Sequence, residues 1–220
     1  DRTGRAEAMH ALGAYGISLP ERVHAHLQTA PEDAPHPDHP SVARAETRVV
    51  ASASHSLEAA AAMAQAEGVR AVILSDAIEG EAREVGKVLA AMVRETATRH
   101  RPFLPPVVLL SGGETTVTIA GSGGRGGRNT EALLSFAIAL GEQGGVSARF
   151  ADTDGIDGAE DNAGAFADGA TPARLRSEGL DPAALLARHD AWAAFDAVGD
   201  LFVPGPTGTN VNDFRAILIR

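Results

Sequence analysis

The sequence predicts an α/β protein with a mixed, largely parallel sheet, helices on both faces, and a β-hairpin next to a glycine-rich loop. From residue 48 to residue 110, short apolar runs alternate with stretches of helical spacing, which favours parallel strands joined by helices. Glycines and β-branched residues follow over residues 111–119, which is typical of a hairpin. Five glycines among residues 121–127 then precede a new helical pattern.

The first part of the chain is predicted to be helical. Residues 3–15 and a stretch that begins at Pro20 have helical spacing. Residues 31–40 hold four prolines and three acidic residues, so we predict a solvated linker there. His36, Asp38 and His39 are of metal-ligand types, but nothing nearby fixes a ligand geometry, and the linker is the preferred interpretation.

The rest of the chain alternates apolar β-branched runs with helical patterns. We expect strands at 48–52, 69–74, 103–110, 148–151 and 214–219. We expect helices at 56–66, 79–99, 163–168, 171–179 and 181–188, and we expect Trp192 and Phe195 in the core.

The glycine-rich loop is the first candidate site. It follows the turn signal Ser111, Gly112 and Gly113 and a second expected strand at 115–119, and it enters a helix near Asn129. The free N–H groups and the dipole of a helix start attract anions, and Arg125 and Arg128 add charged donors. We interpret the loop as a cradle for phosphate or carboxylate. The alternative is a tight turn whose arginines face solvent.

A run of aspartates is the second candidate. Asp152, Asp154 and Asp157, with two glycines between and after them, follow the strand expected at 148–151. Ligands gather at the carboxyl ends of strands in open α/β sheets, and carboxylates suit Mg²⁺ or a substrate hydroxyl. An Asx-rich turn is the alternative, and the spacing lacks the terminal glutamate of an EF-hand. The turn residues 205–213 form a further loop that can donate hydrogen bonds to a ligand.

Composition narrows the classes of function. The 220 residues suffice for one large domain or two small ones. A net charge of −10 argues against nucleic acid or an anionic membrane as a partner, and the lack of cysteine excludes thiolate chemistry. We expect no membrane span and no signal peptide, which leaves the cytoplasm as the expected location.

The glycines fit one of the two common nucleotide-binding motifs, and only weakly. A P-loop is excluded, because Gly80 and Gly86 have five residues between them and Val88 stands where a hydroxyl residue is required. Gly121, Gly123 and Gly126 fit the G-x-G-x-x-G pattern, with Asp152 as a ribose-binding acid. This favours an oxidoreductase only weakly, since the preceding strand looks like half of a hairpin.

Four motifs in the same order resemble the C-terminal MOFRL domain of glycerate 2-kinases: L-S-G-G-E-T-T-V, G-G-R-N-T-E, D-T-D-G-I-D-G and G-P-T-G-T-N-V-N-D-F. The resemblance covers residues 48–220 well and the earlier residues more loosely. It implies that residues 1–46 are a helical connector after a missing N-terminal domain, and that residues 47–220 are a MOFRL-like α/β domain.

The resemblance implies transfer of the γ-phosphate of ATP to D-glycerate, giving 2-phosphoglycerate, with Mg²⁺, in a cleft between two domains. The family also uses a lysine of the N-terminal domain that has no match here, and Lys87 does not replace it. The chain alone is therefore expected to fold but not to phosphorylate glycerate.

The resemblance assigns the catalytic arginine to Arg128, and Asp154 and Asp157 are the expected Mg²⁺ ligands or acceptors of the hydroxyl proton. The other motif positions are the expected substrate- and phosphate-binding residues: Ser111, Gly112, Gly113, Glu114, Gly124, Arg125, Gly126, Gly127, Asn129, Asn210 and Asn212. The loops 111–113, 121–128, 152–158 and 205–213 should lie together at one edge of the sheet.

The expected partners are glycerate, ATP and the missing N-terminal domain, and a homodimer is left open. Nucleic acid and membranes are not expected. Two alternatives stand beside the kinase. One is an NAD(P)H-dependent hydroxypyruvate reductase, a name that members of the family have carried. The other is a non-catalytic anion-binding domain.

Overall fold

The computed structural model describes residues 4–29, 38–119, 121 and 123–220. The chain forms two compact units, Asp1–Val50 and Ala51–Arg220. The division expected from the sequence was 1–46 and 47–220. No helix within the described residues is both long and apolar enough to cross a membrane.

The first unit is helical. Its described helices are α1 (Arg5–Ala14), α2 (Glu21–Thr29) and α3 (Pro40–Ala43). Neither α1 nor α2 buries a residue. Of the three metal-ligand types in the linker, His36 lies outside the described residues. His39 caps α3, because its Nδ1 accepts a hydrogen bond from the Ser41 amide at 3.3 Å.

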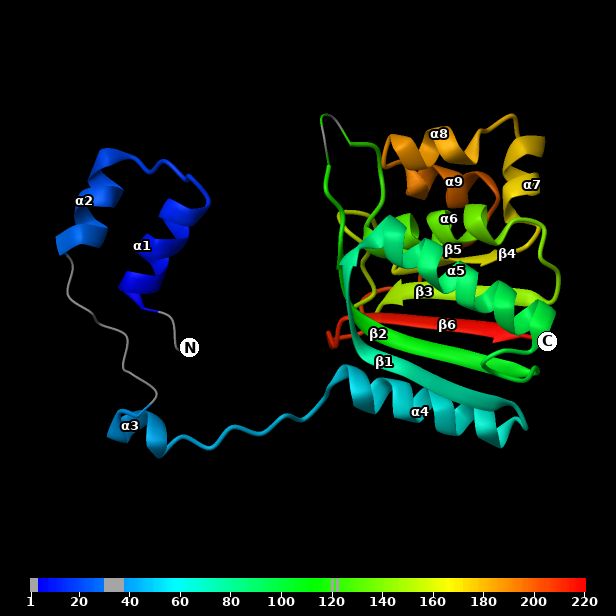
Figure 1. Cartoon of the computed structure of the whole chain (residues 1–220), viewed down its shortest axis with the longest axis horizontal. Helices are drawn as coiled ribbons and strands as arrows, with labels where there is room; N and C mark the ends of the chain where they lie inside the picture. Colours follow the sequence, from blue (N-terminus) through cyan, green and yellow to red (C-terminus); the bar gives the residue numbers. More distant parts are fainter. Residues whose placement is uncertain (1–3, 30–37, 120, 122) are drawn as a thin grey trace. The chain divides into compact units, whose positions relative to one another are not determined.

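The second unit is a six-stranded sheet with helices on both faces, as predicted, and its strand order is β1-β2-β6-β3-β4-β5 (Figure 1). Its strands are β1 (Arg70–Glu81), β2 (Val107–Thr116), β3 (Val146–Asp152), β4 (Gly164–Asp168), β5 (Leu201–Phe202) and β6 (Asp213–Ile219). Its helices are α4 (Ala53–Ala66), α5 (Ala82–Arg99), α6 (Arg128–Leu140), α7 (Thr171–Ser177), α8 (Pro182–Ala187) and α9 (Ala191–Ala197).

The mixed α/β character of the sheet is confirmed, but the expectation that it is largely parallel is wrong. Only β1 and β2 pair in parallel, whereas the other four strand pairs are antiparallel. The reason is β6, the last strand of the chain, which inserts between β2 and β3 and runs antiparallel to both. Such a long-range pairing leaves no local sequence signal.

The predicted hairpin is also wrong, because β2 continues straight through Ser111, Gly112 and Gly113. Gly112 and Gly113 pair with Phe214 and Asp213 of β6. Gly113 has φ +118°, and a Cβ there would lie 2.2 Å from the carbonyl oxygen of Ile78. These glycines allow β1 to approach β2 closely and do not reverse the chain.

Two further elements differ from prediction. The segment 48–52 forms no strand, and Ser52 instead caps α4, its hydroxyl accepting from the His55 amide at 3.4 Å. The helix expected at 163–168 is β4, which pairs with β3. A short apolar run has no clear period, so its partner strand decides its structure.

The core lies between the sheet and the pair α5 and α6, while α4 covers the other face beside β1 (Figure 1). Phe136 of α6 packs against Phe150 of β3, with ring centroids 5.5 Å apart. Helices α5 and α6 approach closely at Gly86, where a Cβ would lie 2.2 Å from the carbonyl oxygen of Ala132. This packing fixes the start of α6 at the edge of the sheet.

Candidate functional site

Helix α6 begins on a buried carboxylate. Asp157 is 1% exposed and accepts hydrogen bonds from the amides of Asn129 and Thr130, both at 2.9 Å, and from the Thr130 hydroxyl at 2.8 Å. Burial raises the pKa of Asp157, and these hydrogen bonds partly oppose that rise. A Cβ at Gly127 would lie 2.4 Å from the Asp157 carboxylate, so glycine is needed there. The amides that the sequence offered to a ligand anion are therefore used by Asp157.

Arg128, the first residue of α6, is held by two aspartates. Its Nε donates to Asp213 at 2.7 Å, and its Nη2 donates to Asp152 at 2.5 Å. Its Nη1 lies 3.6 Å from the Glu114 carboxylate. Burial alone would lower the pKa of Arg128, but the hydrogen bond and charge of Asp213, with Asp152 and Glu114, raise it. The side chain stays 27% exposed, which leaves its outer edge open to a ligand.

Asp213 connects the groups around Arg128. Its side chain is fully buried and also accepts from the Asn129 side chain at 2.9 Å and from the Thr115 amide at 3.2 Å. The buried guanidinium of Arg215 forms an ion pair with it. We call Arg128, Asn129, Asp152, Asp157 and Asp213 the α6 cluster.

Neither Asp213 nor Arg215 was among the individual residues that the sequence predicted for the site. Asp213 does stand within the last of the four motifs, which was the signal available.

Asp152 lies among other carboxylates at the edge of the sheet where α6 begins. Burial raises the pKa of Asp152 to about 6, and the charges of Asp154 and Asp213 add to the rise, while the Asp154 amide and Arg128 oppose it. An excess of carboxylates is chemically suited to a divalent cation. No group of three or more histidine, aspartate or glutamate side chains is arranged as a metal site in the part of the chain that the structure describes. Mg²⁺ commonly needs only one or two carboxylates, since substrate phosphates and water supply the rest.

Asp154 differs from Asp157 in being half-buried at the surface of its loop. Its carboxylate accepts from the Asn210 side chain at 2.9 Å, and its carbonyl accepts from the Thr207 amide at 3.1 Å. The carbonyl of Asn212 accepts from the Thr153 amide at 3.1 Å. The loops 152–158 and 205–213 are therefore tied together, next to the start of α6.

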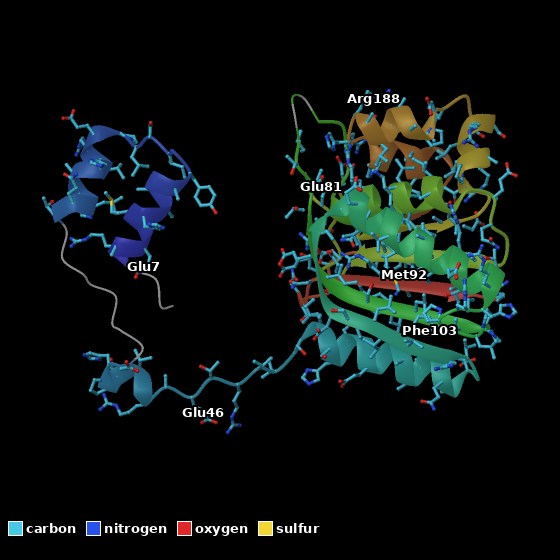
Figure 2. The ribbon with its side chains drawn as sticks, viewed as in Figure 1. Glu7, Glu46, Glu81, Met92, Phe103 and Arg188 are labelled. Atoms are coloured by element: carbon cyan, nitrogen blue, oxygen red, sulfur yellow. The ribbon has the colours of Figure 1, made fainter. Side chains whose placement is uncertain are left out.

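The glycine-rich loop borders a pocket of about 350 Å³. Two residues labelled in Figure 2, Glu81 and Arg188, form hydrogen bonds with the segments on either side of the tip of this loop. The Glu81 carboxylate accepts from the Thr118 amide at 3.2 Å, and the Arg188 carbonyl accepts from the Gly124 amide at 2.8 Å. Gly124, Gly126, Gly127 and Arg128 are among the residues that line this pocket.

Arg125 lies outside that lining. Its guanidinium donates to Glu160 at 3.0 and 2.6 Å and lies 3.4 Å from the ring centroid of Trp192. The two arginines of the loop are thus distinct, because Arg125 pairs with an outer carboxylate and Arg128 with the carboxylates at the sheet edge. Ser111, Gly112 and Gly113, which the sequence suggested as ligand contacts, are buried in β2 and do not line the pocket.

The same pocket contains two residues that sequence analysis missed, Glu131 and His189. Glu131 is 2% exposed and forms an ion pair with Arg83, and its Oε1 lies 3.1 Å from His189 Nδ1. His189 has φ +55°, an uncommon conformation for a non-glycine residue. No local motif marks His189, because it reaches the pocket from the turn after α8.

Residues 107–213 match the model of the MOFRL family. This segment is similar to the MOFRL family domain. Its motif residues are those that the structure brings together at the edge of the sheet.

Two relatives with different names match the whole of this chain. A protein of Agrobacterium vitis that carries the name "Putative hydroxypyruvate reductase" is 50% identical over 220 residues, which are 100% of this chain and 49% of that protein. The glycerate 2-kinase of Pyrococcus horikoshii is 42% identical over 225 residues, covering 100% of this chain and 50% of the kinase.

A solved structure also matches the whole of this chain. The crystal structure of glycerate kinase from Thermotoga maritima superposes with a TM-score of 0.84 at 36% identity, over 100% of this chain and 51% of that one. The chain spans about half the length of the relatives that it matches.

Proposed function

We propose that a protein containing this MOFRL-like domain is a glycerate kinase, which transfers the γ-phosphate of ATP to D-glycerate and gives 2-phosphoglycerate. The observation that carries the proposal is Arg128, held by two aspartates at the edge of the pocket that the glycine-rich loop borders. Phosphoryl transfer depends mainly on positioning and on charges fixed in advance, and this arrangement provides both. The relatives named glycerate kinases support the choice of substrate.

Arg128 is the residue that we assign to the transferred phosphate or to the glycerate carboxylate. Its Nε and Nη2 are used by Asp213 and Asp152, whereas Nη1 has only the contact with Glu114 at 3.6 Å. A planar guanidinium presented by its free edge suits the oxygen atoms of a phosphate or carboxylate.

Asp154 is the carboxylate that remains to hold Mg²⁺ or to accept the proton of the attacking hydroxyl. It is half-buried, whereas Asp157, the other candidate from the sequence, is bound to the amides of α6. We therefore give Asp157 the role of positioning α6. Asp154 is thus the residue that would hold Mg²⁺, which neutralises phosphate charge when bound.

The chain covers only half of its relatives, so we propose that residues from a further domain complete the active site. We expect glycerate turnover from a longer protein that contains this chain, and none from the 220 residues alone. A location in the cytoplasm and a homodimer stay predictions.

The test is an assay of both preparations with ATP, Mg²⁺ and D-glycerate, in which phosphorus NMR identifies the product. Formation of 2-phosphoglycerate by the longer protein supports the proposal. Oxidation of NADH with hydroxypyruvate by the same pure preparation, without ATP turnover, would contradict it.

Hydroxypyruvate reduction is the second candidate, because a relative at 50% identity carries that name. The geometry of the site favours this reduction less than phosphoryl transfer. A dinucleotide fingerprint presents the first amides of its helix to a pyrophosphate, and here Asp157 takes those amides. Asp152, the expected ribose acid, is bound to Arg128.

A further inference from the structure

A second hollow, of about 530 Å³, lies beside helix α4. We call it the α4 groove. Its walls include Ser56, Ala60, Arg149, Ala151, Phe202 and Phe214. It is separate in composition from the pocket at the glycine-rich loop, because no residue lines both.

Arg149 of β3 is the arginine that lines the α4 groove, which Asp152 also lines. Its guanidinium lies over two aromatic rings, 4.9 Å from the ring centroid of Phe202 and 5.3 Å from that of Phe214. The residue is half-buried, and burial lowers the pKa of Arg149 with no carboxylate to oppose the effect. Among residues 4–29, 38–119, 121 and 123–220, none forms a hydrogen bond or ion pair with this guanidinium.

Other partly or fully buried arginines of the domain have a carboxylate partner. Those with an ion pair and less than half of the side chain exposed are Arg83, Arg128, Arg174 and Arg215. A charge removed from water is normally paired, because losing its hydration is costly. Arg149, which is only partly removed from water, is therefore available to pair with an anionic group from outside the described residues.

The size and chemistry of the α4 groove describe the rest of that ligand. A volume of about 530 Å³ is in the range of sites for whole cofactors and far exceeds what one phosphate needs. Ala60, Ala151 and Val211 give it apolar walls, which suit an aromatic body. The side-chain hydroxyls of Ser56 and Thr209 form no hydrogen bond within the described residues and remain available to a sugar.

We propose that the α4 groove binds a nucleoside triphosphate, with its phosphates paired to Arg149 and its base against the apolar walls. The inference rests on the proposed kinase function, because ATP is the reactant of that reaction with both an anionic chain and an aromatic body. The groove also adjoins the α6 cluster. Asp152 lines the groove and holds Arg128, so a nucleotide there lies next to the group assigned to phosphoryl transfer.

The test is calorimetric titration of the 220-residue chain with ATP, adenosine and inorganic triphosphate. Arg149→Met removes the charge but keeps a long side chain, and Ala60→Phe fills the groove. Arg176→Met, at an exposed arginine of α7, is the matched control. Circular dichroism and urea unfolding check that each variant is folded.

We expect Arg149→Met to weaken ATP at least about tenfold, as for loss of one charge-assisted hydrogen bond, and to leave adenosine unchanged. Ala60→Phe should weaken both ligands, and Arg176→Met neither. The inference is overturned if ATP does not bind the chain, if both groove variants bind ATP like the unmodified chain, or if triphosphate binds as well as ATP.

Steady-state kinetics of the longer protein separate this inference from the proposed function. Arg149-dependent ATP binding without glycerate phosphorylation would keep the nucleotide site and remove the kinase. Glycerate phosphorylation with the same KM for ATP in Arg149→Met would keep the kinase and overturn the nucleotide site.

Discussion

Helix α6 begins with an arginine among carboxylates, whereas the arginine of the α4 groove lies over two phenylalanine rings without a carboxylate partner in the described structure. Arg128 contacts Asp152, Asp213 and Glu114, while Arg149 contacts Phe202 and Phe214. A guanidinium that the protein neutralises is fixed in place, and one that it leaves unpaired is open to an outside anion. This difference is the basis on which we propose positioning and catalysis for the α6 cluster and ligand capture for the α4 groove.

The sharpest test of this comparison is stability. Arg128→Met leaves Asp152 without its ion-pair partner in a buried place, and we expect it to lower the free energy of unfolding by about 3 kcal/mol. Arg149→Met removes a charge that has no carboxylate partner among the described residues, so we expect a change below about 1 kcal/mol, set by the lost ring contacts. Urea unfolding measures both. Equal losses in the two variants would mean that Arg149 has a structural partner as well.

The next test concerns activity in a longer protein that phosphorylates glycerate. Arg128→Lys keeps the charge but loses the planar fork that binds two aspartates at once, and we expect kcat to fall about 10²-fold. Arg125→Lys is the matched control within the same loop, because Arg125 pairs with Glu160 and does not line the pocket. Similar small effects at both positions would reduce the loop to a structural element.

Asp157 tests whether the α6 cluster has a structural part. Asp157→Ala leaves the buried amides of Asn129 and Thr130 without an acceptor, and we expect a loss of about 2 kcal/mol in urea unfolding. Asp181→Ala removes the exposed cap of α8, which accepts from Ala183 at 2.9 Å, and should cost about 1 kcal/mol. If Asp157→Ala stays stable but loses affinity for Mg²⁺, the metal role expected from the sequence applies after all.

The smallest expected effect is a pH dependence. The pKa of Asp152 is raised to about 6 in the folded chain, above an unfolded value of about 4, so the native state binds this proton more tightly. The resulting stability is complete below about pH 4 and is lost as the pH rises through 6.

The measurement compares the unmodified chain with Asp152→Asn, which cannot titrate. Between pH 4 and 7 the unmodified chain should lose on the order of 1 kcal/mol relative to this variant. Asp196→Asn, at an exposed position of α9, should show no such difference. A gain in the stability of the unmodified chain relative to Asp152→Asn as the pH rises would show that Arg128 dominates and depresses this pKa.

Part of the fold could be predicted because it depends on local periodicity. The helix expected at 79–99 is α5, Ala82–Arg99, since a long amphipathic pattern needs no partner to be recognised. The glycines at 111–113 misled the prediction. Glycine is required both by turns and by backbones that approach closely, and only the position of β1 shows that the second reason applies.

The sequence by itself determined most of the candidate site residues. These are the two arginines of the glycine-rich loop, the aspartates at and after the end of β3, and the polar residues of the last loop, all within recognisable motifs. Only the tertiary structure decided what each one does. Asp154 and Asp157 look alike in sequence, but Asp157 is bound to the amides of α6 and Asp154 remains at the surface of its loop.

Arg149 belongs to no motif, and whether it meets a carboxylate within the described residues depends on which side chains the sheet and α4 bring near it. Burial and charge pairing are properties of neighbours in space. A linear pattern determines the type of a side chain but not the groups that will surround it.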